Sequence, residues 1–283
     1  MADNTSTDSK VSTKPDIATI AGLVIALGGI IGGLIMEKGN IRDIAQITAA
    51  IIVLGGTFGA VLVSMPMKVV LGAFKRLKHV VLEQSRSPNA LIEEIIGYAT
   101  KARKNGLVSL EQEAERITDP FLKKALTLAV DGTDLQEIRK MLELEIGLEE
   151  HHAEAEAKVF EAAGGYAPTI GIIGAVMGLI QVMKELGNTD EVGRGIAVAF
   201  VATVYGVGLA NIFLLPAATK IKSRTQEEVH MKELLVEGVA GIVEGLNPKL
   251  IRSKLEAFAP PSNGKEQPAA KASRAGAAKT AEV

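Results

Sequence analysis

The sequence predicts an all-α, polytopic membrane protein that has four transmembrane helices and a helical domain between the second and third of them. Three observations support this prediction. Hydrophobic residues make up 47% of the 283 positions and gather in four long runs. No Asp, Glu, Lys, Arg or His interrupts any of the four runs. Outside the runs, apolar residues recur at helical spacing, and no alternating strand pattern competes with it.

The four runs cover residues 17–36, 44–67, 162–183 and 195–219. A helix needs about twenty residues to cross a hydrocarbon core roughly 30 Å thick, so each run is long enough. A large soluble protein with four buried helices is the alternative, and four separate charge-free runs argue against it. The first run is not expected to be a cleaved signal peptide, because Asp16 precedes it and Glu37 and Lys38 follow it without a small-residue cleavage site.

Basic residues at the ends of the runs predict the orientation of the chain. They follow the second and fourth runs, at Lys68, Lys75, Arg76, Lys78, Lys220, Lys222 and Arg224. The two other loops hold mixed charge. Because cytoplasmic loops carry an excess of Lys and Arg, both termini and the segment between runs two and three are predicted to be cytoplasmic.

The chain therefore divides into six predicted parts. They are a disordered cytoplasmic N-terminus (1–15), transmembrane helices one and two (16–67), a helical cytoplasmic domain (68–161), transmembrane helices three and four (162–219), cytoplasmic C-terminal helices (220–258) and a disordered tail (259–283). The tail is rich in Pro, Ala, Gly, Ser and Lys, which cannot bury enough apolar surface to fold.

Helix-start signals recur through the predicted cytoplasmic domain. They are Ser87-Pro88, Ser109 with Gln112 as a capping box, Asp119-Pro120, and Thr133 with Gln136. Gly106 and Asp131-Gly132 are predicted to end the helices that precede them. The last start signal opens a long helix that runs towards the third transmembrane run.

The composition excludes several functions. The chain has no Cys and four His, so disulfides and Cys nucleophiles are excluded and no metal site is expected. A net charge of −2 gives no basis for nucleic-acid binding. There is no phosphate-binding glycine loop, Ser-His-Asp arrangement or zincin motif, and we therefore predict that the chain is not an enzyme and holds no cofactor.

The four runs offer no titratable group for ion transport. Ionisable residues within a membrane usually mark an ion route. Their absence here means that the chain either moves no ions or depends on a partner for the titrating side chain. Such a partner would contact helices rich in small residues.

Small and polar residues in the runs predict which helices receive neighbours. We expect Gly28, Gly29, Gly32 and Gly33 of the first run to pack within the subunit. We expect the third and fourth runs to receive another helix, because their small residues coincide with isolated polar groups, at Thr169, Thr203, Tyr205 and Asn211. The hydroxyls are also suited to line a narrow wet path.

Two prolines, Pro168 and Pro216, lie near the cytoplasmic ends of the third and fourth runs. A proline in a helix removes one backbone hydrogen bond and permits a kink. Each alone is compatible with a helix boundary, whereas two at the same depth favour a hinge.

Charged residues cluster around Gly106. Lys101, Arg103 and Lys104 end one predicted helix, and Glu111, Glu113 and Glu115 begin the next. This order complements the helix dipoles, which is enough to explain it. The alternative is a charged docking surface for a cytoplasmic partner.

Several long motifs, in order along residues 15–258, resemble the MotA/PomA family of flagellar motor stator subunits. They are ARKNGLVSLE at 102–111, DPF at 119–121, GYAPTIGIIG at 165–174, AVAFVATVYG at 197–206 and NP at 247–248. Separated matches of this length are far more specific than one short motif. The resemblance covers most of the chain and agrees with the predicted four spans.

The resemblance implies a partnership that would explain the missing titratable group. Five copies of the chain would surround a MotB/PomB-like dimer that is anchored to peptidoglycan and supplies an ion-binding membrane Asp. The assembly would lie in the bacterial inner membrane, and its function would be to convert ion flow into torque for motility.

The resemblance also assigns roles to particular residues. It implies that Arg103 and Glu111, with Lys104, Glu113 and Glu115 beside them, contact a FliG-like rotor protein. It maps the mechanistic prolines of the family onto Pro168 and Pro216. The polar residues of the ion path would include Thr169, Thr203 and Tyr205.

The translocated ion is predicted to be H⁺ rather than Na⁺. Sodium-driven relatives carry a Thr where this chain has Ala175, although Thr203 matches a hydroxyl of the sodium type. A sodium site needs several oxygen ligands, whereas proton transfer needs only access for water. A sodium-driven PomA-type stator and a TolQ/ExbB-like, proton-driven energiser of the envelope are the nearest alternatives, and a membrane scaffold without ion flux is a third.

Overall fold

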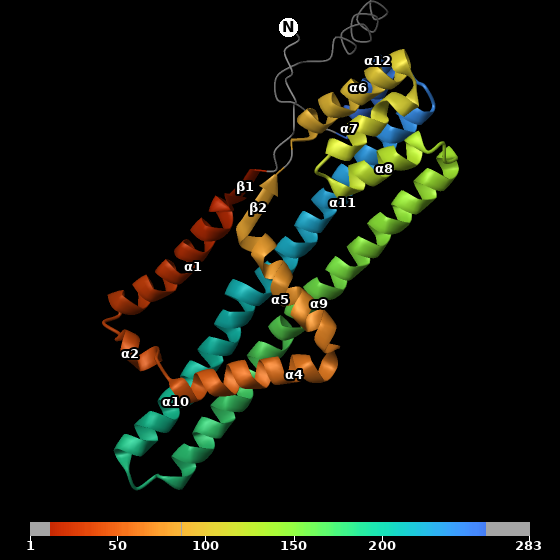
Figure 1. Ribbon diagram of the computed structural model, residues 1–283. Coiled ribbons are helices and arrows are strands. Elements are labelled where there is room, and N and C mark those ends of the chain that lie inside the picture. The colour runs from red at the N-terminus through yellow and green to blue at the C-terminus, as the bar shows by residue number, and fades with distance from the viewer. Residues whose placement is uncertain (1–11, 86, 259–283) are drawn as a thin grey trace, which may run out of the picture.

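The computed structural model describes residues 12–85 and 87–258, and the chain within them is almost wholly helical (Figure 1). The elements in chain order are β1 Ser12–Pro15, α1 Ile17–Met36, α2 Ile41–Ile44, α3 Ile47–Ala50, the π-helical η1 Ile51–Gly55, α4 Gly56–Ser64, α5 Met67–Val81, β2 Leu82–Ser85, α6 Pro88–Asn105, the 3₁₀-helical η2 Leu107–Leu110, α7 Glu111–Arg116, α8 Pro120–Val130, α9 Leu135–Lys184, α10 Thr189–Gly208, the π-helical η3 Leu209–Leu214, α11 Leu215–Val243 and α12 Pro248–Leu255. The predicted disorder of residues 1–11 and 259–283 lies outside the described residues.

Four described helices are long and apolar enough to cross a membrane, which confirms the four-span prediction. They are α1, the continuous Ile47–Ser64 formed by α3, η1 and α4, the end of α9, and the start of Thr189–Val243. The second span is shorter than the run of residues 44–67, because Ala45 and Gln46 separate it from α2.

Two helices are much longer than a membrane span. α9 has 50 residues, and α10, η3 and α11 form a second continuous helix from Thr189 to Val243. At 1.5 Å per residue, α9 is about 75 Å long. Figure 1 shows the two helices side by side, from the α9–α10 turn at one end to the α6–α8 region at the other. Residues 161–162 and 219–220, expected as domain boundaries, therefore lie inside continuous helices.

The helical domain has one hydrophobic core that two distant parts of the chain build together. α6, α8 and the start of α9 supply Leu91, Ile95, Leu126 and Leu142, and the end of α11 supplies Leu234, all fully buried. α12 closes the same core with Ile251 and Leu255. Residues 68–161 and 220–258, predicted as separate parts, thus fold into a single unit.

A two-stranded ribbon was not predicted. Ser12–Pro15 pair antiparallel with Leu82–Ser85, although residues 12–15 were expected to be disordered. Strand pairing uses backbone groups, so four residues without an alternating side-chain pattern are enough to form it. The ribbon joins the start of α1 to the end of α5.

Two of the predicted helix starts are confirmed in detail. Ser87 is the N-cap residue of α6, with Pro88 in its first turn. Asp119 caps α8, since its Oδ1 accepts hydrogen bonds from the backbone N–H of Phe121 at 2.8 Å and of Leu122 at 3.0 Å. Gly106 ends α6 with a φ of 81°, which a residue with a side chain rarely adopts.

The other two predicted caps were wrong. The Ser109 hydroxyl donates to the carbonyl oxygen of Gly106 at 2.6 Å inside η2, so it does not cap α7. Asp134, rather than Thr133, caps α9 through a 2.9 Å hydrogen bond from the Gln136 backbone N–H. In both places the N-cap position lies one residue later than predicted, at Leu110 and Asp134, and the spacing of the residues alone does not reveal this.

Candidate ion path and partner-facing surface

The glycines of the third and fourth spans pack against each other within the subunit. A Cβ atom on Gly206 would lie 2.5 Å from the carbonyl oxygen of Ala167, and one on Gly171 would lie 2.9 Å from that of Ala202. One on Gly178 would lie 2.8 Å from the Gly195 carbonyl oxygen. These glycines therefore pack α9 against α10 within the subunit. That the third and fourth spans also receive a helix from a partner stays a prediction.

The first span shows the opposite arrangement. No residue of α1 is buried, and nothing lies within 4 Å of a Cβ built on Gly28, Gly29, Gly32 or Gly33. The expectation that these glycines pack within the subunit was therefore also wrong. Figure 1 shows α1 standing apart from α9 and α10, with one end next to the β1–β2 ribbon and the other followed by α2.

The predicted polar groups donate hydrogen bonds to backbone carbonyls. Thr169 donates to Tyr166 at 2.8 Å, Thr203 to Ala199 at 3.2 Å, and the Asn211 side-chain amide to Val207 at 2.9 Å, each within its own helix. Tyr205 instead donates to the carbonyl oxygen of Ile44 at 2.6 Å and so joins α10 to α2. The threonine oxygens retain lone pairs that can accept hydrogen bonds from water.

Thr203 lies on the α9–α10 contact, and Ala175 lies on α9 one turn beyond Gly171. The Cα of Thr203 is 3.5 Å from the position of a Cβ on Gly171, and Ala175, one turn further along α9, is partly buried. No group of three or more His, Asp or Glu side chains suited to a metal ion occurs among residues 12–85 and 87–258.

The two prolines lie at one level of the α9–α11 contact. α9 continues through Pro168, whose missing N–H leaves the carbonyl of Gly164 without its helical partner. A Cβ on that same Gly164 would lie 2.6 Å from Leu215, the residue before Pro216. Pro216 is the second residue of α11, two positions after the π-helical turn η3 ends at Leu214.

An ion cluster at the start of α1 was missed by the sequence analysis. The Asp16 carboxylate, with 6% of its side chain exposed, contacts Lys220 Nζ at 2.5 Å and Arg224 Nη2 at 2.8 Å, both on α11. It also caps α1, and the Thr19 hydroxyl donates to it at 2.9 Å. The hydrogen bond from Lys220, more than any other contact, holds the pKa of Asp16 far below its usual value. An acid at the start of one span, with basic residues at the end of another, is the signal that could have revealed it.

Further ion pairs join α9 to its neighbours in the helical domain. Arg139 on α9 binds Glu237 on α11 through two hydrogen bonds of 2.6 and 3.2 Å, and this contact lowers the pKa of Glu237. Three more pairs follow along α9 towards the membrane spans: Glu149 with Lys232, Glu156 with Arg76, and Glu161 with Lys222. The pairs with Glu237, Lys232 and Lys222 fix the register between α9 and α11, and the pair with Arg76 holds α5 against α9.

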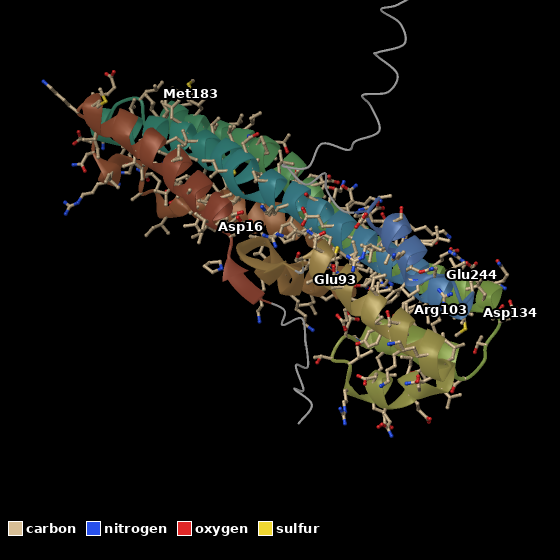
Figure 2. The ribbon with its side chains drawn as sticks, turned by 90° about the horizontal axis from the view of Figure 1, so that it is seen from above. Asp16, Glu93, Arg103, Asp134, Met183 and Glu244 are labelled. Atoms are coloured by element: carbon tan, nitrogen blue, oxygen red, sulfur yellow. The ribbon has the colours of Figure 1, made fainter. Side chains whose placement is uncertain are left out.

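The predicted rotor-facing residues gather at the corner formed by α6, η2 and α7. Arg103, Lys104, Glu111 and Glu115 are exposed, and no ion pair between them and another described residue occurs. Glu113 is half-buried and pairs with Lys101 at 2.6 Å. Figure 2 shows Arg103 and Met183 towards opposite ends of the molecule, with Asp16 between them. The corner thus offers free charges of both signs at the end remote from the α9–α10 turn.

These features define a class: a multi-pass α-helical membrane protein whose two longest helices extend from the spans into a charged helical domain. Two family models match the chain, the MotA/TolQ/ExbB proton channel family over residues 113–234 and the Motility protein A N-terminal family over residues 20–105. The chain belongs to the MotA branch of this family, which comprises channel-forming stator subunits and not enzymes.

Individual relatives support the assignment along nearly the whole chain. Motility protein A of Helicobacter pylori is 35% identical over 251 residues, which are 89% of this chain and 98% of the relative. The structure of C. jejuni MotAB matches with a TM-score of 0.83 and 32% identity, over 89% of this chain and 99% of that one. The flagellar MotAB stator complex of Bacillus subtilis matches with a TM-score of 0.78 and 33% identity, over 86% and 96%.

Proposed function

We propose that this chain is a flagellar stator subunit that, with a MotB-like partner, converts ion flow across the inner membrane into torque on a rotor. The supporting observation is its similarity, over nearly its full length, to subunits of solved MotAB complexes. The geometry accords with this role. The two long helices that contain the third and fourth spans continue into the core of the charged domain, so a movement of the spans displaces the domain directly.

The proposed assembly contains five copies of the chain around a peptidoglycan-anchored MotB-like dimer, in contact with lipid. The dimer supplies the Asp that binds the ion, which accounts for spans without a titratable group. The uncovered surface of α1 leaves room for neighbouring copies. Both termini and the helical domain lie in the cytoplasm, a topology supported by the basic residues that follow the second and fourth spans.

The proposed ion is H⁺, since Ala175 supplies no oxygen ligand on α9. Cells whose own stator genes are deleted, and which express this chain with its MotB-like partner, should swim in sodium-free medium and stop when an uncoupler removes the proton gradient. Cells that swim only with sodium would identify a sodium-driven stator. Unchanged motility after deletion of the gene from its own organism would contradict the stator function and favour an envelope energiser.

Charge reversal at Arg103 tests the proposed contact with a FliG-like rotor. We expect Arg103→Glu to reduce swimming speed several-fold, because it replaces a free cation at the α6–η2–α7 corner with an anion. A compensating reversal on the rotor should restore part of the speed, as expected for a direct charge pair. Torque is measured on tethered cells, and immunoblots of the membrane fraction report the amount of the variant. A low torque with a normal amount of protein indicates that the contact with the rotor is lost.

Lys158→Glu is the matched control, because Lys158 is exposed on α9 between the corner and the spans. This control should swim normally. Normal torque from the Arg103→Glu, Glu111→Lys double variant with an unmodified rotor would contradict the assigned role of both residues.

A further inference from the structure

Helix α5 has one face buried in the protein. Val70, Ala73 and Val80 belong to a buried cluster with Phe160 of α9 and Ile221 of α11. Arg76, on an adjacent side, pairs with Glu156 of α9. α5 is therefore a fixed part of the structure.

The rest of α5 exposes large apolar side chains. Met67 is 56% exposed, Leu71 55% and Phe74 44%. The Phe74 ring lies 6.0 Å from that of Phe58, which belongs to the second span. The exposed apolar strip of α5 is thus continuous with the apolar surface of α4.

Three lysines lie beside this apolar strip. Lys68, Lys75 and Lys78 are all exposed, and none forms an ion pair with another residue that the structure describes. Lys68 and Lys75 are seven residues apart, which places them two turns apart on the same side of the helix. The exposed surface therefore combines apolar contact area with unneutralised positive charge.

α5 lies at the level where the spans end. It begins at Met67, three residues after α4 ends at Ser64. Its buried cluster includes Ile221, next to Lys220, which binds Asp16 at the start of α1. Figure 1 shows α5 crossing the α9–α11 pair rather than running along it. A helix that follows the second span directly and crosses the α9–α11 pair is placed to lie along a membrane surface.

We propose that α5 is an interfacial helix that binds anionic phospholipid headgroups in the leaflet beside the helical domain. Lys68, Lys75 and Lys78 contact the lipid phosphates, while Met67, Leu71 and Phe74 enter the acyl boundary. Basic residues close to an anionic leaflet are attracted to it, and long lysine side chains reach the headgroups from a helix whose apolar strip is immersed. The proposal is independent of which ion is moved and of the rotor.

The absence of tryptophan from the chain permits a direct test. Leu71→Trp places a single fluorophore on the exposed strip of the full-length protein, reconstituted into vesicles of phosphatidylcholine and phosphatidylglycerol. Bromine on the acyl chains of one lipid at a time reports which lipid lies beside the tryptophan. We expect brominated phosphatidylglycerol to quench the tryptophan fluorescence more than its mole fraction in the vesicle predicts. The preference over phosphatidylcholine should be about fivefold and should weaken in high salt.

Replacing Lys68, Lys75 and Lys78 with Gln should reduce this preference to unity. A second triple variant, with Gln at Lys123, Lys140 and Lys249, removes equal charge from exposed positions of the helical domain and should retain it. Equal quenching by the two lipids in the parent protein would overturn the proposal. Lack of quenching by either lipid would also overturn it, because α5 would then face protein or water.

Discussion

Replacing Gly206 with valine is expected to prevent α9 and α10 from packing and to abolish the folded membrane form. The Cβ alone would lie 2.5 Å from the carbonyl oxygen of Ala167 and 3.1 Å from the Cα of Gly171. Both atoms belong to backbone inside a helix, so no side-chain rotation relieves the contact, and the helices must separate. Overpacking of this kind costs about 3 kcal/mol or more, a large part of the stability of a typical domain.

The measurement is thermal unfolding of the detergent-solubilised full-length chain, followed by circular dichroism. Gly208→Val is the matched control, because a Cβ built two residues along α10 meets nothing within 4 Å. The control should melt close to the parent, since valine is at least as good a helix former as glycine. If both variants melted like the parent, the close α9–α10 contact would be wrong. If both variants were destabilised equally, the assignment of the close contact to Gly206 would be wrong.

The distribution of charge and hydrophobicity was sufficient to predict the helical class and the four spans. Charge-free runs are a property of the local sequence. In a bilayer such a run forms a helix, because a helix satisfies the hydrogen bonds of its own backbone. The exact extent of the helices was harder to predict. Residues 150–165 change from charged to apolar without a helix break, and this change suggests a domain boundary although α9 continues through it. A composition shift marks where the surroundings change and need not mark where a helix ends.

Helix partners could not be predicted from small residues alone. Gly28 and Gly206 both lie in glycine-rich, apolar runs, yet one is uncovered and the other contacts backbone. The difference depends on where the loops place each helix, which is non-local information. The exposed charges around Gly106 were predictable, because cations at a helix end and anions at the next helix start follow local rules.

The Asp16 cluster was not predicted, because Lys220 and Arg224 lie 204 and 208 positions after Asp16 in the chain. It has a clear structural consequence. α1 has no buried residue, so its position relative to α11 depends on few contacts, and the ion cluster is the most buried of them. The ribbon of β1 with β2 is the other attachment near the same end.

We therefore expect Asp16→Asn to destabilise the attachment of α1 strongly while leaving its helix cap intact. Asparagine caps a helix about as well as aspartate, so the substitution removes the charge and retains the cap. Lys220 and the largely buried Arg224 would then face a neutral side chain, and breaking a buried ion pair from one side costs about 3 kcal/mol. The thermal midpoint of the full-length chain should fall by several degrees.

Asp134→Asn is the matched control, since Asp134 caps α9 through Gln136 at an exposed position and should tolerate the same change. The pH dependence gives a second readout. Because the folded pKa of Asp16 lies below its usual 3.8, its stabilisation is complete above about pH 4 and is lost as the pH falls towards the folded pKa. The difference in the free energy of unfolding between the parent and Asp16→Asn should thus be constant near neutrality. Below pH 4 it should narrow by about 1.4 kcal/mol per pH unit. A difference that stayed constant down to pH 3 would show that the charge of Asp16 does not hold α1 in place.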